Sequence, residues 1–270
     1  MKIAFLGGGN MASALIGGLA ARGFDAAAIS VIELVPAARE RLAAQYKLHA
    51  SAAPDAATRA ADTVVLAVKP QDMRAALAAL APLAAGKLFL SIAAGLRLAD
   101  LSRWLGGHRK LVRAMPNTPA LIGAGIAGLY ALPEVSAAER SRAEQILDAV
   151  GETVWVKDEA LLDPVTALSA SGPAYVFWFI EQLAASGEAL GLEPEVARKL
   201  ALATVAGAAR LAAQSAEPPA VLRERVTSKG GTTEAALKVF AEEQMAERLR
   251  RALEAASRRG AELGEILGKD

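Results

Sequence analysis

The sequence predicts an α/β fold: an N-terminal Rossmann-type, doubly wound parallel sheet followed by an all-helical C-terminal domain. Short apolar runs alternate with helical segments over about the first 160 residues, as in a parallel sheet covered by helices. A glycine-rich turn follows the first apolar run, and beyond residue 160 every long segment has helical character. We therefore predict two domains: a Rossmann-type α/β domain over residues 1–160 and an all-helical domain over 161–270.

The first apolar run, Ile3 to Leu6, is typical of a buried parallel strand, and it leads through glycine into a helical segment. Gly7, Gly9 and Ala12 match the dinucleotide fingerprint: a tight turn, a close approach to pyrophosphate, and close helix packing. The amides and positive dipole end of the helix favour phosphate. The predicted cofactor contacts here are Leu6, Gly7, Gly8, Gly9, Asn10, Met11 and Ala12.

The second predicted strand, Ile29 to Ile32, ends at Glu33. The fingerprint expects an acidic residue about 20 residues after its glycines, where it binds the ribose hydroxyls. Glu33 would repel a 2′-phosphate and so favours NADH, whereas Arg39 and Arg41 on the next predicted helix can accept that phosphate. The choice between NADPH and NADH stays open at this point.

Two further loops are predicted at the carboxyl edge of the sheet, where the glycine turn also lies. Thr63 to Val68 forms a buried strand that ends at Lys69-Pro70, and a helix is expected from Gln71 to Leu83. The next strand, Lys87 to Ile92, leads to small residues that let a flat nicotinamide ring approach the backbone. The predicted cofactor contacts in these two loops are Ala67, Val68, Lys69, Pro70, Ala93, Ala94 and Gly95.

The rest of the first domain continues the alternation. A helix is predicted from Leu98 to Leu105, and the prolines of Met115-Pro116-Asn117-Thr118-Pro119 predict a stiff, extended loop. The segment Ile126 to Tyr130, a helix over 137–150 and a strand over 153–156 complete the domain.

The second half begins with a helix predicted from Ser169-Ala170-Ser171-Gly172-Pro173, whose following residues, Ala174 to Ile180, are apolar on every side. A helix that is hydrophobic all round is buried on all faces, so we infer a subunit interface, with a central helix inside one monomer as the alternative. Further helices begin near Pro194 and Pro219. A charge-patterned final helix runs from about Thr232 toward Leu267.

The segment Val226 to Leu237 contains paired glycines before a threonine-rich helix start. Such a turn forms a nest of backbone amides that binds an anion, and a substrate carboxylate is a natural occupant. The alternative is a glycine loop with a good helix cap.

The composition of the chain argues against several classes of protein. The 270 residues carry a net charge of +1, with no footprint for nucleic acid or anionic membranes. The absence of cysteine excludes disulfides and cysteine-ligated metals, His49 and His108 stand apart, and no metal site is predicted. No apolar stretch approaches the roughly 20 residues of a membrane span, and no signal peptide is recognised. We expect a cytoplasmic protein.

Together these segments resemble the pyrroline-5-carboxylate reductase family. The resemblance is carried by 7–12, 67–70, 92–95, 115–119, 171–175 and 226–237, in this order along the chain. It implies reduction of L-1-pyrroline-5-carboxylate to L-proline in proline biosynthesis, by hydride transfer from NADPH or NADH to the imine carbon. It also implies a contact of Asn117 with the cofactor, and a homodimer through the helical domain, often built into larger rings.

The resemblance implies a carboxylate site at the amides of Gly230, Gly231, Thr232 and Thr233, with the Thr233 hydroxyl as the catalytic contact to the ring nitrogen. Lys229 departs from the proline common in the family, and Glu33 from the small polar residue of members that favour NADPH. No histidine or cysteine is placed to protonate the imine. We expect the substrate to arrive as the iminium or to take its proton from water, with Thr233 orienting it.

Three other functions are open on the sequence. A β-hydroxyacid dehydrogenase uses a lysine on the helix after the domain junction, but the predicted helix from Ala174 to Leu190 has none. A cyclic imine reductase of broader scope is a second alternative. A regulator that binds NAD(P) without turnover is the third.

Overall fold

The computed structural model describes residues 1–269 and divides the chain into two compact units. The first unit comprises Met1–Ser171 together with the chain from Ala255 on, and the second is Gly172–Glu254. The sequence prediction placed the domain change near residue 160 and assigned the whole remainder to the helical domain.

The first unit is built on a sheet with the order β3-β2-β1-β4-β5-β6-β7-β8. Its strands are β1 Ile3–Leu6, β2 Ile29–Ile32, β3 His49–Ser51, β4 Thr63–Leu66, β5 Leu88–Ser91, β6 Leu111–Met115, β7 Gly125–Ala131 and β8 Gly151–Trp155. All neighbouring pairs are parallel except β6 and β7. The connection from β6 to β7 holds only the short turn η3, Thr118–Ile122, and is too short for the crossover that a parallel pair needs.

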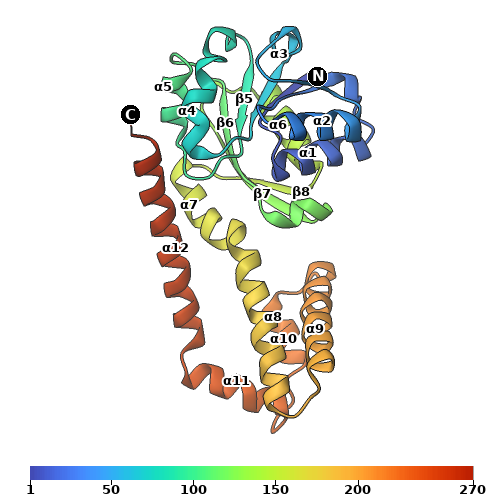
Figure 1. Ribbon diagram of the computed structural model, residues 1–270. Helices are drawn as coiled ribbons and strands as arrows, with labels where there is room; N and C mark the ends of the chain where they lie inside the picture. Colours follow the sequence, from blue (N-terminus) through green and yellow to red (C-terminus); the bar gives the residue numbers. More distant parts are fainter. Residues whose placement is uncertain (270) are drawn as a thin grey trace. The chain divides into compact units, whose positions relative to one another are not determined.

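Helices cover both faces of this sheet, as the doubly wound prediction requires (Figure 1). They are α1 Asn10–Ala21, α2 Pro36–Tyr46, α3 Ala56–Ala60, α4 Pro70–Ala78, α5 Leu98–Trp104, α6 Ala137–Asp148 and α7 Leu162–Val165. Short 3-10 turns are η1 Ala26–Ala28, η2 Ala81–Leu83 and η4 Glu159–Leu161, and a π-helical turn, η5, spans Thr166–Ala170. The helix predicted from Gln71 to Leu83 is therefore two elements, α4 and η2.

Alternation along the strands separates two apolar clusters. Ile3 and Phe5 of β1 pack in one cluster with residues of α1 and α6, such as Leu15. Ala4 and Leu6 point to the opposite face and pack with residues of α4 and α5, such as Leu77. Because β1 is buried on both faces, its sequence is continuously apolar.

The second unit contains α8 Gly172–Ala189, α9 Pro194–Gln214, α10 Pro219–Arg225 and α11 Thr232–Glu242. Helices α8 and α9 pack together, yet the aromatic residues of α8 are open in the single chain, Phe177 being 65% and Trp178 55% exposed. The helix predicted to be buried on all faces thus has an uncovered apolar surface within one chain.

The long final helix predicted from Thr232 to Leu267 is divided. Gln244 adopts a left-handed conformation with φ of 54°, which ends α11 and separates it from α12, Met245–Leu267. Helix α12 begins within the second unit and ends within the first. Among the described helices, none combines the length and apolar character needed to cross a lipid bilayer.

Candidate active site

Three loops of the first unit meet at the carboxyl edge of the sheet, where the strand order changes direction between β1 and β4. Backbone bonds join them to the strand ends: the Gly7 amide donates to Ile32 at 2.8 Å, and the Ala67 amide donates to Leu6 at 2.8 Å. The Ile92 amide donates to Leu66 at 3.1 Å. The predicted glycine turn, the Ala67–Pro70 loop and the Ala93–Gly95 loop therefore lie along one edge.

The glycine turn has the geometry that a diphosphate needs. Gly7 has φ of 97°, and a Cβ there would lie 2.9 Å from the Ala67 carbonyl oxygen, so only glycine fits. A Cβ on Gly9 would meet nothing within 4 Å, which leaves open space beside the turn. Gly9 also caps α1 without a side-chain hydrogen bond, so its first-turn amides can serve an anion.

Glu33, at the end of β2, is fixed against this turn. Its carboxylate accepts the Gly8 amide at 2.8 Å through one oxygen and the Val35 amide at 2.8 Å through the other. Each carboxylate oxygen has a second acceptor site, so Glu33 can still accept ribose hydroxyls. The carboxylate is thus held beside the glycine turn, at the carboxyl end of β2.

The two arginines considered for a 2′-phosphate differ in their surroundings. Arg39 donates from one guanidinium nitrogen to the backbone carbonyls of Glu33 at 2.8 Å and Leu34 at 3.1 Å. Arg41 is exposed on α2. The residues directly after Glu33 are apolar and open to solvent, Leu34 being 78% exposed.

The other predicted contacts have distinct positions. Lys69 is exposed in the N-cap position of α4, directly after the β4 edge, with Pro70 at the first helical position. Asn117 is almost buried, and its side chain accepts the Ile126 amide at 3.0 Å and donates to Ser169 at 3.4 Å. Asn117 therefore fixes the β6–β7 connection, a role that the sequence did not indicate.

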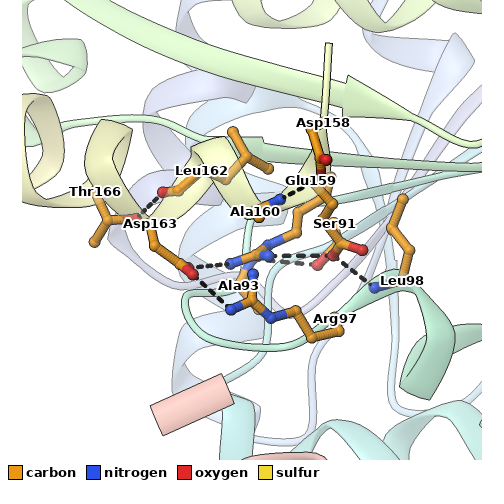
Figure 2. A network of polar contacts seen from close by, with 11 residues as sticks. Ser91, Ala93, Arg97, Leu98, Asp158, Glu159, Ala160, Leu162, Asp163 and Thr166 are labelled. Carbon is orange, nitrogen blue, oxygen red and sulfur yellow. Dashed lines mark hydrogen bonds and ion pairs between the residues drawn. The ribbon is translucent and has the colours of Figure 1, made fainter. Parts of the chain in front are cut away.

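The β5–α5 loop, residues 92–97, is held by a polar network that no sequence pattern indicates (Figure 2). Arg97 donates to Asp163 at 2.6 Å, and Glu159 accepts both the Leu98 amide at 2.8 Å and the Arg113 guanidinium at 3.1 Å. The partners lie far apart along the chain, so no local pattern could reveal them.

The turn from Ser228 to Thr233 starts α11 in the second unit. Gly230 has φ of 72°, and its amide donates to the Glu234 carboxylate at 2.6 Å. The Gly231 amide donates to the Ser228 carbonyl at 3.0 Å, and Gly231 caps α11 without a side-chain bond. Of the four predicted carboxylate-binding amides, those of Gly230 and Gly231 thus already have hydrogen-bond partners, Glu234 and Ser228.

A groove of about 950 Å³ runs along the face of α11 that carries Glu234, Lys238 and Ala241. Thr232 and Thr233 do not line it.

Within residues 1–269, no cluster of metal-binding side chains occurs. His49 contacts Asp55 and His108 contacts the Lys87 carbonyl.

Comparison with known proteins agrees with this geometry. Residues 159–263 match the family model for pyrroline-5-carboxylate reductase dimerisation, and residues 2–95 match that for NADP oxidoreductase, coenzyme F420-dependent. The chain is 49% identical to pyrroline-5-carboxylate reductase from Pseudomonas aeruginosa, over 99% of this chain and 98% of the relative. The Haemophilus influenzae enzyme is 39% identical over 97% of each chain.

Solved structures give the same result. The pyrroline-5-carboxylate reductase of Coxiella burnetii superposes with a TM-score of 0.93 at 39% identity, covering 97% of this chain and 98% of that one. The Plasmodium falciparum enzyme with NADP bound superposes with a TM-score of 0.83 at 28% identity, covering 98% of each chain.

The fold and these relatives define a Rossmann-fold oxidoreductase that depends on NAD(P) and acts on a carbon–nitrogen double bond. The matched dimerisation model supports homo-oligomerisation. The chain belongs to the pyrroline-5-carboxylate reductase family.

Proposed function

We propose that this chain reduces L-1-pyrroline-5-carboxylate to L-proline as the reductive step of proline biosynthesis. When bound, NAD(P)H supplies a hydride to the imine carbon. A proton on the nitrogen forms the N–H bond, so that the C=N double bond becomes a C–N single bond. The observation that carries the proposal is the Ser228–Thr233 turn in a chain 49% identical to an enzyme of this name: a carboxylate, that of Glu234, already accepts a hydrogen bond there.

The substrate carboxylate is proposed to bind the backbone amides at this turn. The first-turn amides of α11, those of Thr232 and Thr233, stand at the positive end of the helix dipole with no side-chain cap at Gly231. The Gly230 amide becomes available when Glu234 rotates away. Backbone amides recognise the carboxyl group without requiring a charged side chain.

Thr233 is proposed to orient the imine nitrogen through its hydroxyl, which can donate or accept. The two histidines have partners elsewhere in the first unit. We therefore propose that the substrate arrives as the iminium or takes its proton from water. The chain's contribution is then orientation of the reacting groups within about 3–3.5 Å and stabilisation of developing charge.

At the cofactor edge, we propose that the amides of α1 and the glycine turn hold the diphosphate, with Lys69 as a further cation. The open space at Gly9 and the uncapped start of α1 support this placement. Residues 93–95 are proposed to contact the nicotinamide half of the cofactor. Asn117 is proposed to support the β6–β7 connection.

Glu33 is proposed to make NADH the preferred cofactor. Its fixed carboxylate can accept ribose hydroxyls but repels a 2′-phosphate. Arg39 already donates to two backbone carbonyls beside Glu33, and the next residues supply no hydroxyl or cation for a phosphate.

The exposed aromatic face of α8 supports a homodimer through the helical domain, because an isolated chain leaves Phe177 and Trp178 in water. Assembly of such dimers into larger rings is compatible with this proposal. A cytoplasmic location, without nucleic-acid or membrane partners, fits the net charge of +1.

A steady-state assay on pyrroline-5-carboxylate with NADH and with NADPH tests the function. We expect turnover with both cofactors and higher kcat/KM with NADH. A cyclic imine without the carboxylate is the control substrate and should react at least 10-fold less efficiently, because it cannot use the amide nest. Cofactor binding without turnover would contradict the proposal and favour a regulatory protein. Equal rates on the control imine would favour a broader imine reductase.

A further inference from the structure

The β5–α5 loop leaves the carboxyl edge of the sheet at Ser91 and enters α5 at Leu98. Ala94 is exposed, and the amide of buried Ala93 donates to the Ser91 hydroxyl at 3.3 Å. Gly95 has φ of 81°, and the loop has no regular secondary structure of its own. Its position is therefore set by what packs against it.

The end of α12 covers this loop at very short range. A Cβ on Gly264 would lie 2.9 Å from the Gly95 carbonyl oxygen and 3.1 Å from Nε of Arg97. Directly after α12, a Cβ on Gly268 would lie 2.3 Å from a carboxylate oxygen of Asp100, in the first turn of α5. Helix and loop therefore touch through backbone, and any side chain at Gly264 has to displace the loop.

Besides the contact with α12, charged side chains of other elements also hold the loop (Figure 2). Asp163, whose side chain is 9% exposed, accepts Arg97 at 2.6 Å and lies 3.9 Å from Arg113. Arg113 is 2% exposed and pairs with Glu159 at 3.1 Å. Burial lowers the pKa of Arg113, and the carboxylate of Glu159 opposes that shift.

Glu159 completes the arrangement by capping α5. It accepts the Leu98 amide at 2.8 Å, a first-turn donor for which the N-cap residue, Arg97, provides no side-chain acceptor. Removing one partner from a buried charge network leaves the others uncompensated, so the network behaves as one unit. The end of the loop is thereby fixed at two points: Asp163 holds the Arg97 side chain, and Glu159 holds the Leu98 amide.

We propose that Arg97, Asp163, Glu159 and Gly264 are positioning residues that set the β5–α5 loop for the nicotinamide half of the cofactor. They touch neither cofactor nor substrate; they act through the backbone of residues 93–95. The inference rests on the proposed cofactor edge. It concerns only the nicotinamide half of the cofactor, because the proposed diphosphate site is a different turn, Gly7–Gly9, whose side of α1 is open and uncapped.

The separation gives a direct test. Gly264→Leu is compared with Glu265→Leu, which adds the same side chain to the same helix at an exposed position. Binding of NADH and of ADP-ribose, which lacks the nicotinamide, is measured by calorimetry on the full-length protein. We expect Gly264→Leu to weaken NADH at least 5-fold while ADP-ribose changes less than 2-fold. Glu265→Leu should leave both unchanged.

Asp163→Asn provides a second variant that introduces no bulk. In the same calorimetric measurement it should weaken the binding of NADH more than the binding of ADP-ribose. Equal weakening of NADH and ADP-ribose in both variants would show a merely structural role and overturn the inference, as would unchanged NADH binding. These binding experiments do not depend on turnover, so a wild-type protein inactive on pyrroline-5-carboxylate would reject the proposed function and leave this inference standing.

Discussion

The backbone amide of Gly230 donates a 2.6 Å hydrogen bond to the carboxylate of Glu234, in the first turn of α11. This bond puts an internal carboxylate at the turn where we propose that the substrate carboxylate binds. The substrate must then compete with Glu234 for the amide and also meet its negative charge. Glu234 is exposed, so its side chain can rotate into solvent at little cost.

Removing this internal carboxylate should improve substrate binding. We expect Glu234→Ala to lower the KM for pyrroline-5-carboxylate roughly 2- to 10-fold, the value of one displaced hydrogen bond, with kcat little changed. Steady-state kinetics at saturating NADH measures it, with Glu242→Ala on the same helix as the control. A higher KM in Glu234→Ala would mean that Glu234 shapes the turn rather than competing with substrate.

Loss of the Thr233 hydroxyl should impair the reaction itself. We expect Thr233→Ala to lower kcat/KM roughly 10- to 1000-fold, because an interaction that orients the imine in the transition state is lost. NADH affinity should be retained. Thr233→Ser keeps the hydroxyl and should recover most of the activity. Wild-type kinetics in Thr233→Ala would remove the hydroxyl from the mechanism.

Cofactor preference should depend on Glu33. Glu33→Ser removes the carboxylate that would face a 2′-phosphate, and we expect kcat/KM with NADPH to rise roughly 10-fold while that with NADH falls. The ratio of the two efficiencies is the measurement, and Glu40→Ser, an exposed change on α2, is the control. An unchanged ratio in Glu33→Ser would show that preference is set elsewhere.

Glu139 should make stability depend on acid pH. Burial raises the pKa of Glu139, but its hydrogen bonds with Lys110 and Ser136 outweigh burial and hold it at about 2, below the ordinary 4.5. The stabilisation is complete above pH 4.5 and is lost as the pH falls through about 2. Glu139→Gln should cost about 1 kcal/mol at pH 7.

Urea unfolding of wild type and Glu139→Gln at several pH values checks this prediction. The difference in free energy of unfolding should narrow between pH 5 and pH 2. Glu40→Gln, at an exposed position, should show no such trend. A difference that stays constant over this range would rule out ionised Glu139 as the source of the stabilisation.

Association should depend on the apolar face of α8. Trp178→Glu introduces a charge on the exposed aromatic surface, and burying an unpaired charge costs several kcal/mol. We expect dissociation toward monomers by sedimentation velocity, whereas Gln45→Glu on α2 should leave the oligomer intact. An oligomer of unchanged size in Trp178→Glu would place the interface elsewhere.

Local patterns predicted much of the first unit. The apolar strand β1, the obligate glycine at Gly7 and the start of α1 depend on adjacent residues, so a sequence window contains the needed information. Edge strand β3 was missed because it is short and only partly buried, and so lacks an apolar run. The break at Gln244 was missed because glutamine carries no signal for a left-handed residue.

The sequence by itself therefore determined the alternating α/β order, the glycine turn between β1 and α1 and the glycine–threonine turn before α11. Only the tertiary structure decided that β7 runs antiparallel to β6, that Arg97 meets Asp163, and that Gly264 touches the Gly95 carbonyl. The physical reason is range. Strand, turn and cap preferences act between neighbours along the chain, whereas these pairings exist only after the sheet has brought distant segments together.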